Sequence, residues 1–127
     1  MSPSPAKTNV KRYEGTTMTM EVEPRGNALL ITPHGRLAEM EGHQLERELL
    51  NLIDQGASRL VIDLSDVPFI TSTCLGALML AHKRVRAANG YVHVACAQPL
   101  VCQILEITKL TKLFGPYGAI DEALREK

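Results

Sequence analysis

Three consecutive hydroxyl side chains, Thr71, Ser72 and Thr73, are the residues of this chain best placed to carry chemistry. They follow a short loop, residues 66–70, and they open a segment of helical composition that reaches residue 85. The free N–H groups and positive dipole end of a helix start favour a bound anion. A phosphate on one of these hydroxyls would therefore change the charge of the surface without unfolding the domain. Such a phosphorylated hydroxyl would be a surface switch.

A hydroxyl at a helix start also has a purely structural use. Thr71 or Ser72 could cap the helix by accepting a hydrogen bond from a free N–H, which stabilises a helix by about 1 kcal/mol. Composition alone favours this capping role over phosphorylation. A hydrolase is a weaker interpretation, because Ser72 lacks a Gly-x-Ser-x-Gly setting and the chain has no glycine-rich phosphate loop.

The sulfur and imidazole side chains give no sign of a metal site or cofactor. The three cysteines are odd in number and lie in apolar surroundings, so we expect buried, reduced thiols. Cys74 lies near the predicted helix start, where a dipole can lower a thiol pKa, but its apolar neighbours favour a small buried residue. The histidines show no ligand spacing with each other or with cysteine. These are His34, His43, His82 and His93.

Length and charge restrict the class of protein. The chain has 127 residues, 45% of them hydrophobic, which suits one globular domain. Its 14 basic residues balance its 14 acidic residues, so no charge excess favours binding to nucleic acid. No apolar run approaches the roughly 20 residues that cross a bilayer, and the first residues do not resemble a signal peptide. We expect a cytoplasmic protein without membrane insertion.

Hydrophobic periodicity predicts an alternation of strands and helices after a flexible leader, residues 1–15. We expect a mixed α/β sheet of four to five strands in a single domain, with about four helices packed mainly on one face. The predicted strands are 17–22, 28–32, 59–64, 91–95 and 113–114, and the predicted helices are 39–55, 71–85, 99–107 and 119–126.

Several segments together resemble the STAS domain, which is found in bacterial anti-sigma factor antagonists. The segment Asp63-Leu-Ser-Asp-Val-Pro-Phe-Ile-Thr-Ser-Thr-Cys-Leu-Gly76 is similar to the signature of that family. Residues 28–37 resemble its second strand and Gly-x-Leu turn, and residues 89–95 and 105–110 resemble later segments. The resemblance implies a STAS domain over residues 16–127.

The family pattern is typically Asp-Ser-Ser/Thr-Gly-Leu-Gly, and its first hydroxyl after the Asp is phosphorylated. That position falls on Ser72, with Thr73 as the alternative acceptor. The resemblance then implies partner switching: the unphosphorylated protein binds an anti-sigma factor that is also a serine kinase, and the phosphoprotein releases it until a phosphatase acts. The chain would be substrate and ligand, and not an enzyme.

Three positions depart from the pattern: Thr71 replaces the usual Asp, Cys74 a Gly, and Ala38 a further Asp. Without these two carboxylates, a second interpretation is an unphosphorylated STAS subunit of a stressosome-like or lipid-transport ABC assembly. A homodimer is also compatible with the sequence. The partner-binding surface expected from the resemblance comprises Arg36, Leu37, Ala38, Glu39, Thr71, Ser72, Thr73 and Cys74.

Overall fold

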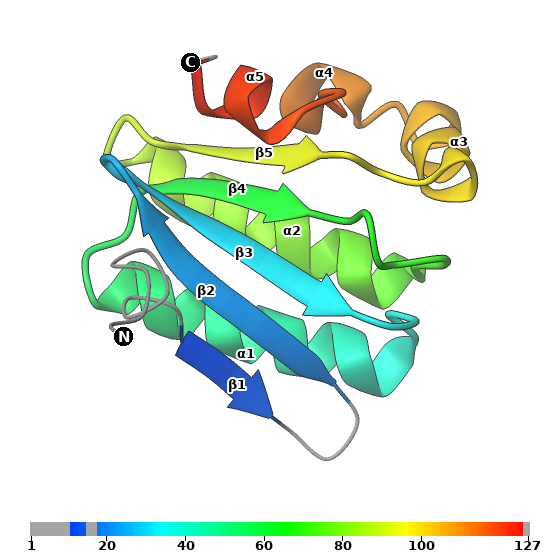
Figure 1. Cartoon of the computed structure of the whole chain (residues 1–127), viewed down its shortest axis with the longest axis horizontal. Helices are drawn as coiled ribbons and strands as arrows, with labels where there is room; N and C mark the ends of the chain where they lie inside the picture. Colours follow the sequence, from blue (N-terminus) through cyan, green and yellow to red (C-terminus); the bar gives the residue numbers. More distant parts are fainter. Residues whose placement is uncertain (1–10, 15–17, 126–127) are drawn as a thin grey trace, which may run out of the picture.

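The computed structural model describes residues 11–14 and 18–125, and Figure 1 shows strands and helices that alternate through most of this range. The strands are β1 (Lys11–Glu14), β2 (Thr19–Arg25), β3 (Ala28–His34), β4 (Arg59–Asp63) and β5 (Tyr91–Ala95). The helices are α1 (Glu39–Asp54), α2 (Ser72–Arg86), α3 (Pro99–Ile107), α4 (Thr111–Phe114) and α5 (Ile120–Arg125).

The strands form one five-stranded sheet in the order β1-β2-β3-β4-β5. Antiparallel pairing joins β1, β2 and β3, whereas β3, β4 and β5 are parallel to one another. The helices α1 and α2 are the crossovers that parallel pairing requires. Both crossover helices consequently begin at the edge of the sheet where the parallel strands end (Figure 1).

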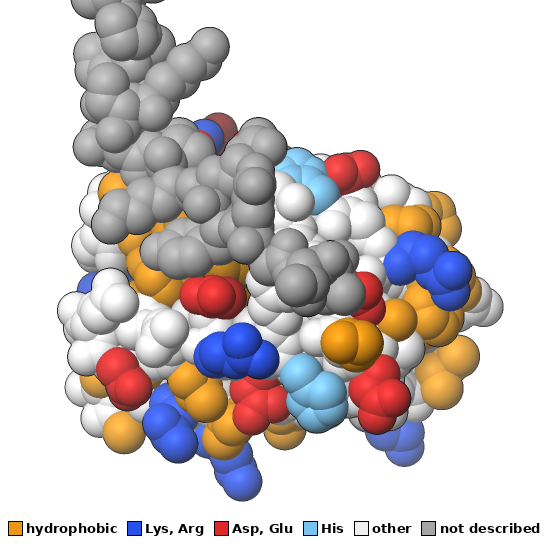
Figure 2. Space-filling view, turned by 90° about the horizontal axis from the view of Figure 1, so that it is seen from below, with side chains coloured by type: hydrophobic (Ala, Val, Ile, Leu, Met, Phe, Trp, Pro, Cys, Tyr) orange, Lys and Arg blue, Asp and Glu red, His pale blue; other side chains and the backbone are white. Residues whose placement is uncertain are grey.

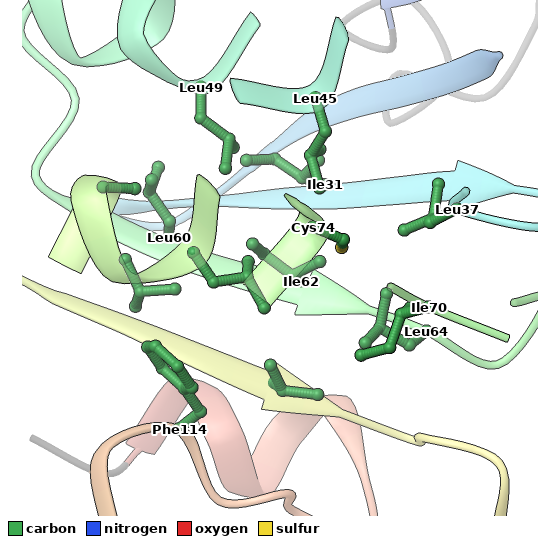
Figure 3. Close-up of a cluster of buried hydrophobic side chains, with 14 of the residues drawn as sticks. Ile31, Leu37, Leu45, Leu49, Leu60, Ile62, Leu64, Ile70, Cys74 and Phe114 are labelled. Carbon is green, nitrogen blue, oxygen red and sulfur yellow. The ribbon is translucent and has the colours of Figure 1, made fainter. Parts of the chain in front are cut away.

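The two faces of the sheet are covered unequally. On one face, Leu60 and Ile62 of β4 pack in the main core with Leu45 and Leu49 of α1 (Figure 3). Val61 points to the opposite face, where the short helix α5 covers a smaller apolar cluster. The expected mixed sheet with helices mainly on one face is confirmed. The smaller cluster comprises Leu30, Val61, Tyr91, Ala95 and Ala123.

The helices α1 and α2 touch most closely at Gly42. A Cβ added there would lie 2.8 Å from the backbone nitrogen of Cys74 and 3.0 Å from Cγ2 of Thr73. The first distance is shorter than real Cβ contacts in proteins and the second is tighter than most of them, so glycine suits this approach. The contact fixes the start of α2 against the first turns of α1.

Two predictions near the ends of the chain need correction. The predicted strand 113–114 is the end of α4, because Phe114 donates its N–H to the carbonyl of Leu110 at 3.1 Å and buries its ring in the main core. At the other end, Lys11–Glu14 of the predicted leader form β1, since backbone pairing with the free edge of β2 needs no apolar pattern. The rest of that leader lies outside the described residues.

Charged side chains are dispersed over the face that Figure 2 shows, which is the lower side of Figure 1. Acidic and basic side chains alternate there without forming a large region of one sign. This pattern agrees with the balanced composition of the chain. Within residues 18–125, no helix combines the length and apolarity needed to cross a bilayer.

Candidate functional site

Ser72 is the first residue of α2, and a well anchored loop presents it to solvent. After β4 the chain buries Val67 together with Leu64 and Ile70, and these side chains fix the loop against the core. Figure 3 shows Leu64 and Ile70 side by side in this core. The backbone carbonyl of Asp66 in this loop also accepts a hydrogen bond from the N–H of Gly35 at 3.0 Å. Ser72 itself is exposed, and no described residue forms a hydrogen bond with its hydroxyl. An accessible hydroxyl therefore rests on a fixed support.

Thr71 connects this loop to the neighbouring loop between β3 and α1. Its Oγ1 donates to the carbonyl oxygen of Leu37 at 3.3 Å, and its backbone N–H donates to the same oxygen at 3.1 Å. Leu37 in turn donates its N–H to the carbonyl of Phe69 at 2.9 Å. The capping role predicted for Thr71 or Ser72 is wrong, because α2 has no side-chain cap and the Thr71 hydroxyl turns back to Leu37.

Cys74 points away from the surface. Its side chain is fully buried in the main core, and burial raises the pKa of its thiol to about 12 (Figure 3). The expectation of a small buried residue is confirmed. Leu37 is equally buried. The side chains of Leu37 and Cys74, which we predicted to meet a partner, therefore support the surface from beneath because apolar packing draws them inward.

The remaining predicted contact residues do lie together around the two connected loops. Arg36 and Glu39 are exposed, and Ala38 is half-buried just before α1. The Arg36 guanidinium carbon lies 5.3 Å from the centre of the Phe69 ring, a cation–π geometry that joins the two loops a second time. Met40, at the start of α1, exposes 64% of its surface and adds an apolar side chain that the sequence analysis did not include.

The sequence analysis also did not predict a polar cluster at the end of β3. Nδ1 of His34 lies 2.7 Å from Oδ2 of Asp66, and its Nε2 lies 3.6 Å from Oε1 of Glu21. These residues come from β3, the β4–α2 loop and β2, so no local motif could have predicted their contact. The imidazole links the loop that precedes Ser72 to the sheet.

This arrangement suits recognition better than catalysis. No histidine or carboxylate of the described part of the chain is hydrogen-bonded to Ser72, so it has no base to activate it as a nucleophile. Within the same residues, no group of three or more His, Cys, Asp or Glu side chains could hold a metal ion. The site presents the exposed hydroxyl of Ser72 together with a cation, an anion and an apolar side chain. These are Arg36, Glu39 and Met40.

The pattern of the STAS domain matches residues 19–123, which is most of the chain. The chain belongs to the STAS domain family. The strands β2 to β5 and the connected loops around Ser72 all fall within the matched part of this STAS domain.

Similar proteins share the same domain over most of their length. A protein of Bordetella bronchiseptica named "Putative anti-sigma factor antagonist BtrV" is 27% identical over 97 residues, which cover 76% of this chain and 84% of that protein. The crystal structure of an anti-sigma factor antagonist from Mycobacterium paratuberculosis is 26% identical with a TM-score of 0.76, covering 85% of this chain and 92% of that chain. An anti-sigma factor antagonist (STAS) domain protein from Planctomyces limnophilus is 25% identical with a TM-score of 0.75, covering 83% and 94%.

The residues of this STAS domain that depart from the expected signature have definite places in the structure. Thr71 uses its hydroxyl to hold Leu37, a bond in which a carboxylate could not be the donor. Cys74 places its backbone nitrogen against Gly42 and its side chain in the core. Ala38 is the half-buried residue that precedes α1, and its side chain forms no cap. Ser72 is exposed beside these three residues.

Proposed function

We propose that this STAS domain is an anti-sigma factor antagonist that works by partner switching at Ser72. Unphosphorylated, it binds a kinase-type anti-sigma factor, and phosphorylation of Ser72 by that partner releases it until a phosphatase restores the hydroxyl. The observation that carries the proposal is the exposed Ser72 hydroxyl at the first residue of α2, which forms no hydrogen bond with any described residue. The named antagonists that this chain resembles support the assignment.

Accessibility favours Ser72 over its two neighbours as the acceptor. Thr71 is half-buried and its hydroxyl is engaged with Leu37. Thr73 is also half-buried, and its methyl group lies against Gly42 of α1. A kinase must reach the acceptor oxygen from solvent, and of the three hydroxyls only that of Ser72 is both exposed and free of hydrogen bonds to described residues.

A phosphate on Ser72 would suit the fold and change the surface. The first N–H groups of α2 have no side-chain cap, so they and the helix dipole stabilise an anion there. The phosphate adds about −1.5 to −2 charges at pH 7. This charge would enter the contact surface near Glu39, and a loss of 1–3 kcal/mol in binding lowers affinity by about 5- to 150-fold. The domain acts as substrate and ligand, and not as a catalyst.

Capture of partners with two variants tests the proposal. Ser72→Ala, used as bait in a lysate of the native cells, should retain an ATP-binding kinase-type anti-sigma factor identified by mass spectrometry. Ser72→Asp should lose most of that protein. Asn51→Asp is the matched control, because it adds one charge on an exposed residue near the other end of α1 and should retain the partner. Equal capture by all three variants would contradict switching at Ser72.

One observation favours a second function. Thr71 stands where the signature of this family usually has a carboxylate, and its hydroxyl holds Leu37 and leaves no acidic group there for a kinase. The same surface could then bind a partner permanently, as a subunit of a stressosome-like or lipid-transport ABC assembly. Capture of such subunits equally by Ser72→Ala and Ser72→Asp would support this alternative.

A further inference from the structure

Two of the three cysteines line one cavity beside the end of β5. The cavity measures about 380 Å³. Cys96 directly follows β5, and Cys102 lies in the first half of α3. Both side chains are half-buried, whereas the sequence analysis expected buried thiols. The described residues that line the cavity are Cys96, Ala97, Cys102, Pro116, Tyr117 and Gly118, and none of them is charged.

Backbone hydrogen bonds hold both walls of this cavity in place. Tyr117 donates its N–H to the carbonyl of Val94 at 2.9 Å, and Cys96 donates its N–H to the carbonyl of Tyr117 at 2.8 Å. On the other wall, Cys102 donates its N–H to the carbonyl of Gln98 at 2.9 Å. The two thiols are therefore carried by backbone that is already ordered, which lowers the entropy lost on binding a ligand.

The two sulfur atoms converge and have weakly bound partners. Sγ of Cys102 donates to the carbonyl oxygen of Ala97 at 3.3 Å, which brings it close to the residue next to Cys96. Sγ of Cys96 donates to the carbonyl oxygen of Gly118 at 3.6 Å. Because a thiol is a weak hydrogen-bond donor, a ligand that bonds to sulfur displaces little.

Cys96 has an unusual backbone conformation for a residue with a side chain. Its φ is +59°, in the left-handed region that glycine and asparagine adopt most readily. A cysteine is disfavoured there, and residues held in such conformations cluster at binding sites. Packing alone does not explain the cysteine, because its side chain is half-buried at the edge of a cavity. The choice indicates that the sulfur itself has a use.

The surroundings of Cys96 favour a bound cation over a free thiolate. Burial raises the pKa of its thiol, the carboxylate of Asp63 raises this pKa further, and a backbone hydrogen bond with Ile120 opposes the rise. Oxidation requires the thiolate, so a thiol that keeps its proton is a poor redox sensor. A metal ion displaces that proton, and the same carboxylate attracts its positive charge.

The number and type of ligands identify the kind of ion. Structural zinc takes four ligands, and iron–sulfur clusters take four cysteines. Among the described residues, no group of three or more His, Cys, Asp or Glu side chains could hold a metal ion. Cys74 cannot join the pair, because it is buried in the main core and Cys96 packs against the smaller cluster on the other face of the sheet. Two thiolates alone suit a soft monovalent ion.

We propose that Cys96 and Cys102 bind one soft monovalent metal ion, such as copper(I), between them. Two sulfur–metal bonds form, two S–H protons pass to solvent, and no electron is transferred. The proposal does not rest on partner switching at Ser72. The site nevertheless borders the loop that precedes Ser72, since Gln98 donates its Nε2–H to the carbonyl of Ser65 at 2.8 Å.

Competition for copper(I) tests the site in the intact, fully reduced protein under anaerobic conditions. The coloured chelator bicinchoninate should give up one equivalent of copper(I) to the native protein. Cys96→Ser and Cys102→Ser should each lose at least about 100-fold in affinity, because even residues behind the ligands of a metal site contribute about 10- to 100-fold. Cys74→Ala is the matched control, since it removes the thiol that does not line the cavity, and it should bind copper(I) as the native protein does.

Two further measurements on the native protein need no variant. X-ray absorption should show copper bound by two sulfur atoms, and one or three sulfur ligands would contradict the site. Light scattering should show no change of mass, because a mass doubled by copper(I) would mean that the thiols come from two molecules. The proposal is also overturned if the native protein takes no copper(I) from the chelator, if either serine variant binds as tightly as the native protein, or if Cys74→Ala loses as much affinity as they do. Circular dichroism shows that each variant retains the fold.

Discussion

Ser72 and Cys74 are two residues apart on α2, yet they meet opposite environments. Ser72 is exposed and Cys74 is fully buried. The difference follows from the helical repeat, which turns the side chain of Cys74 toward the sheet and α1. The chemistry of this segment therefore belongs to the hydroxyl, and the thiol contributes to packing.

The raised pKa of Cys74 predicts a loss of stability in alkali. The unfolded thiol has a pKa near 9.0 and the folded thiol one of about 12, so only the unfolded state ionises between these values. The stabilisation is complete below pH 9 and is lost as the pH rises toward 12, by about 2 kcal/mol at pH 10.5. Urea unfolding at pH 8 and 10.5 should show this difference in the native protein and a smaller one in Cys74→Ala. Equal pH dependence in both would contradict the burial of the thiol.

Thr71→Val should lower the free energy of unfolding by about 1 kcal/mol, because it removes the hydroxyl donor to Leu37 and leaves the backbone bond in place. Urea unfolding measures the change. Thr32→Val is the matched control, since this half-buried threonine of β3 has no side-chain hydrogen bond to a described residue. A loss as large in Thr32→Val as in Thr71→Val would show that the Leu37 bond is not the cause.

At the scale of elements, the contact between α1 and α2 determines where Ser72 lies. Gly42 allows the two helices to approach, and the loops before each helix are joined through Leu37. The surface around Ser72 is thus composed of two helix starts that packing and hydrogen bonds join.

Two glycine substitutions separate close packing from helix propensity. Gly42→Ala should destabilise the domain by about 1–3 kcal/mol, because its Cβ would meet the backbone of Cys74 and not a flexible side chain. Gly76→Ala lies on an exposed position of α2 with nothing within 4 Å of the added Cβ. It should stabilise the domain by up to about 1 kcal/mol. Thermal unfolding compares them, and a stabilising Gly42→Ala would refute the close approach.

At the scale of the whole molecule, the order of elements could be read from the sequence and the contacts between distant elements could not. Hydrophobic periodicity predicted β2 to β5 and the helices α1, α2, α3 and α5, because their buried faces repeat at regular spacing. It misassigned residues 113–114, where two apolar side chains fit either a strand or a helical turn. It also missed β1, because β1 pairs with β2 through backbone hydrogen bonds that need no apolar pattern.

The candidate functional site shows the same division between features that a local pattern predicts and contacts that depend on distant residues. The resemblance to STAS domains singled out Ser72 as the proposed acceptor, and the local pattern predicted the helix start, which the structure places at Ser72. Thr71, Phe69 and His34 each contact a residue more than thirty positions away in the sequence. No rule of local spacing predicts such contacts. Burial of Leu37 likewise follows only from the packed core.

The whole domain should tolerate a negative charge at Ser72. Ser72→Asp places a carboxylate on an exposed residue at an uncapped helix start, where the dipole favours it. The free energy of unfolding should change by less than about 0.5 kcal/mol. Chemical denaturation checks this, and a large loss would mean that phosphorylation acts by unfolding the domain instead of changing its surface.

The most direct test of the account is to map phosphate on the protein purified from its native cells with phosphatase inhibitors present. Intact mass and peptide sequencing, compared across growth and stress conditions, should show a phosphate on Ser72 whose occupancy changes with condition. Phosphate on Thr73 and not on Ser72 would contradict the assignment from accessibility. A fully covered peptide without phosphate under every condition would contradict partner switching itself.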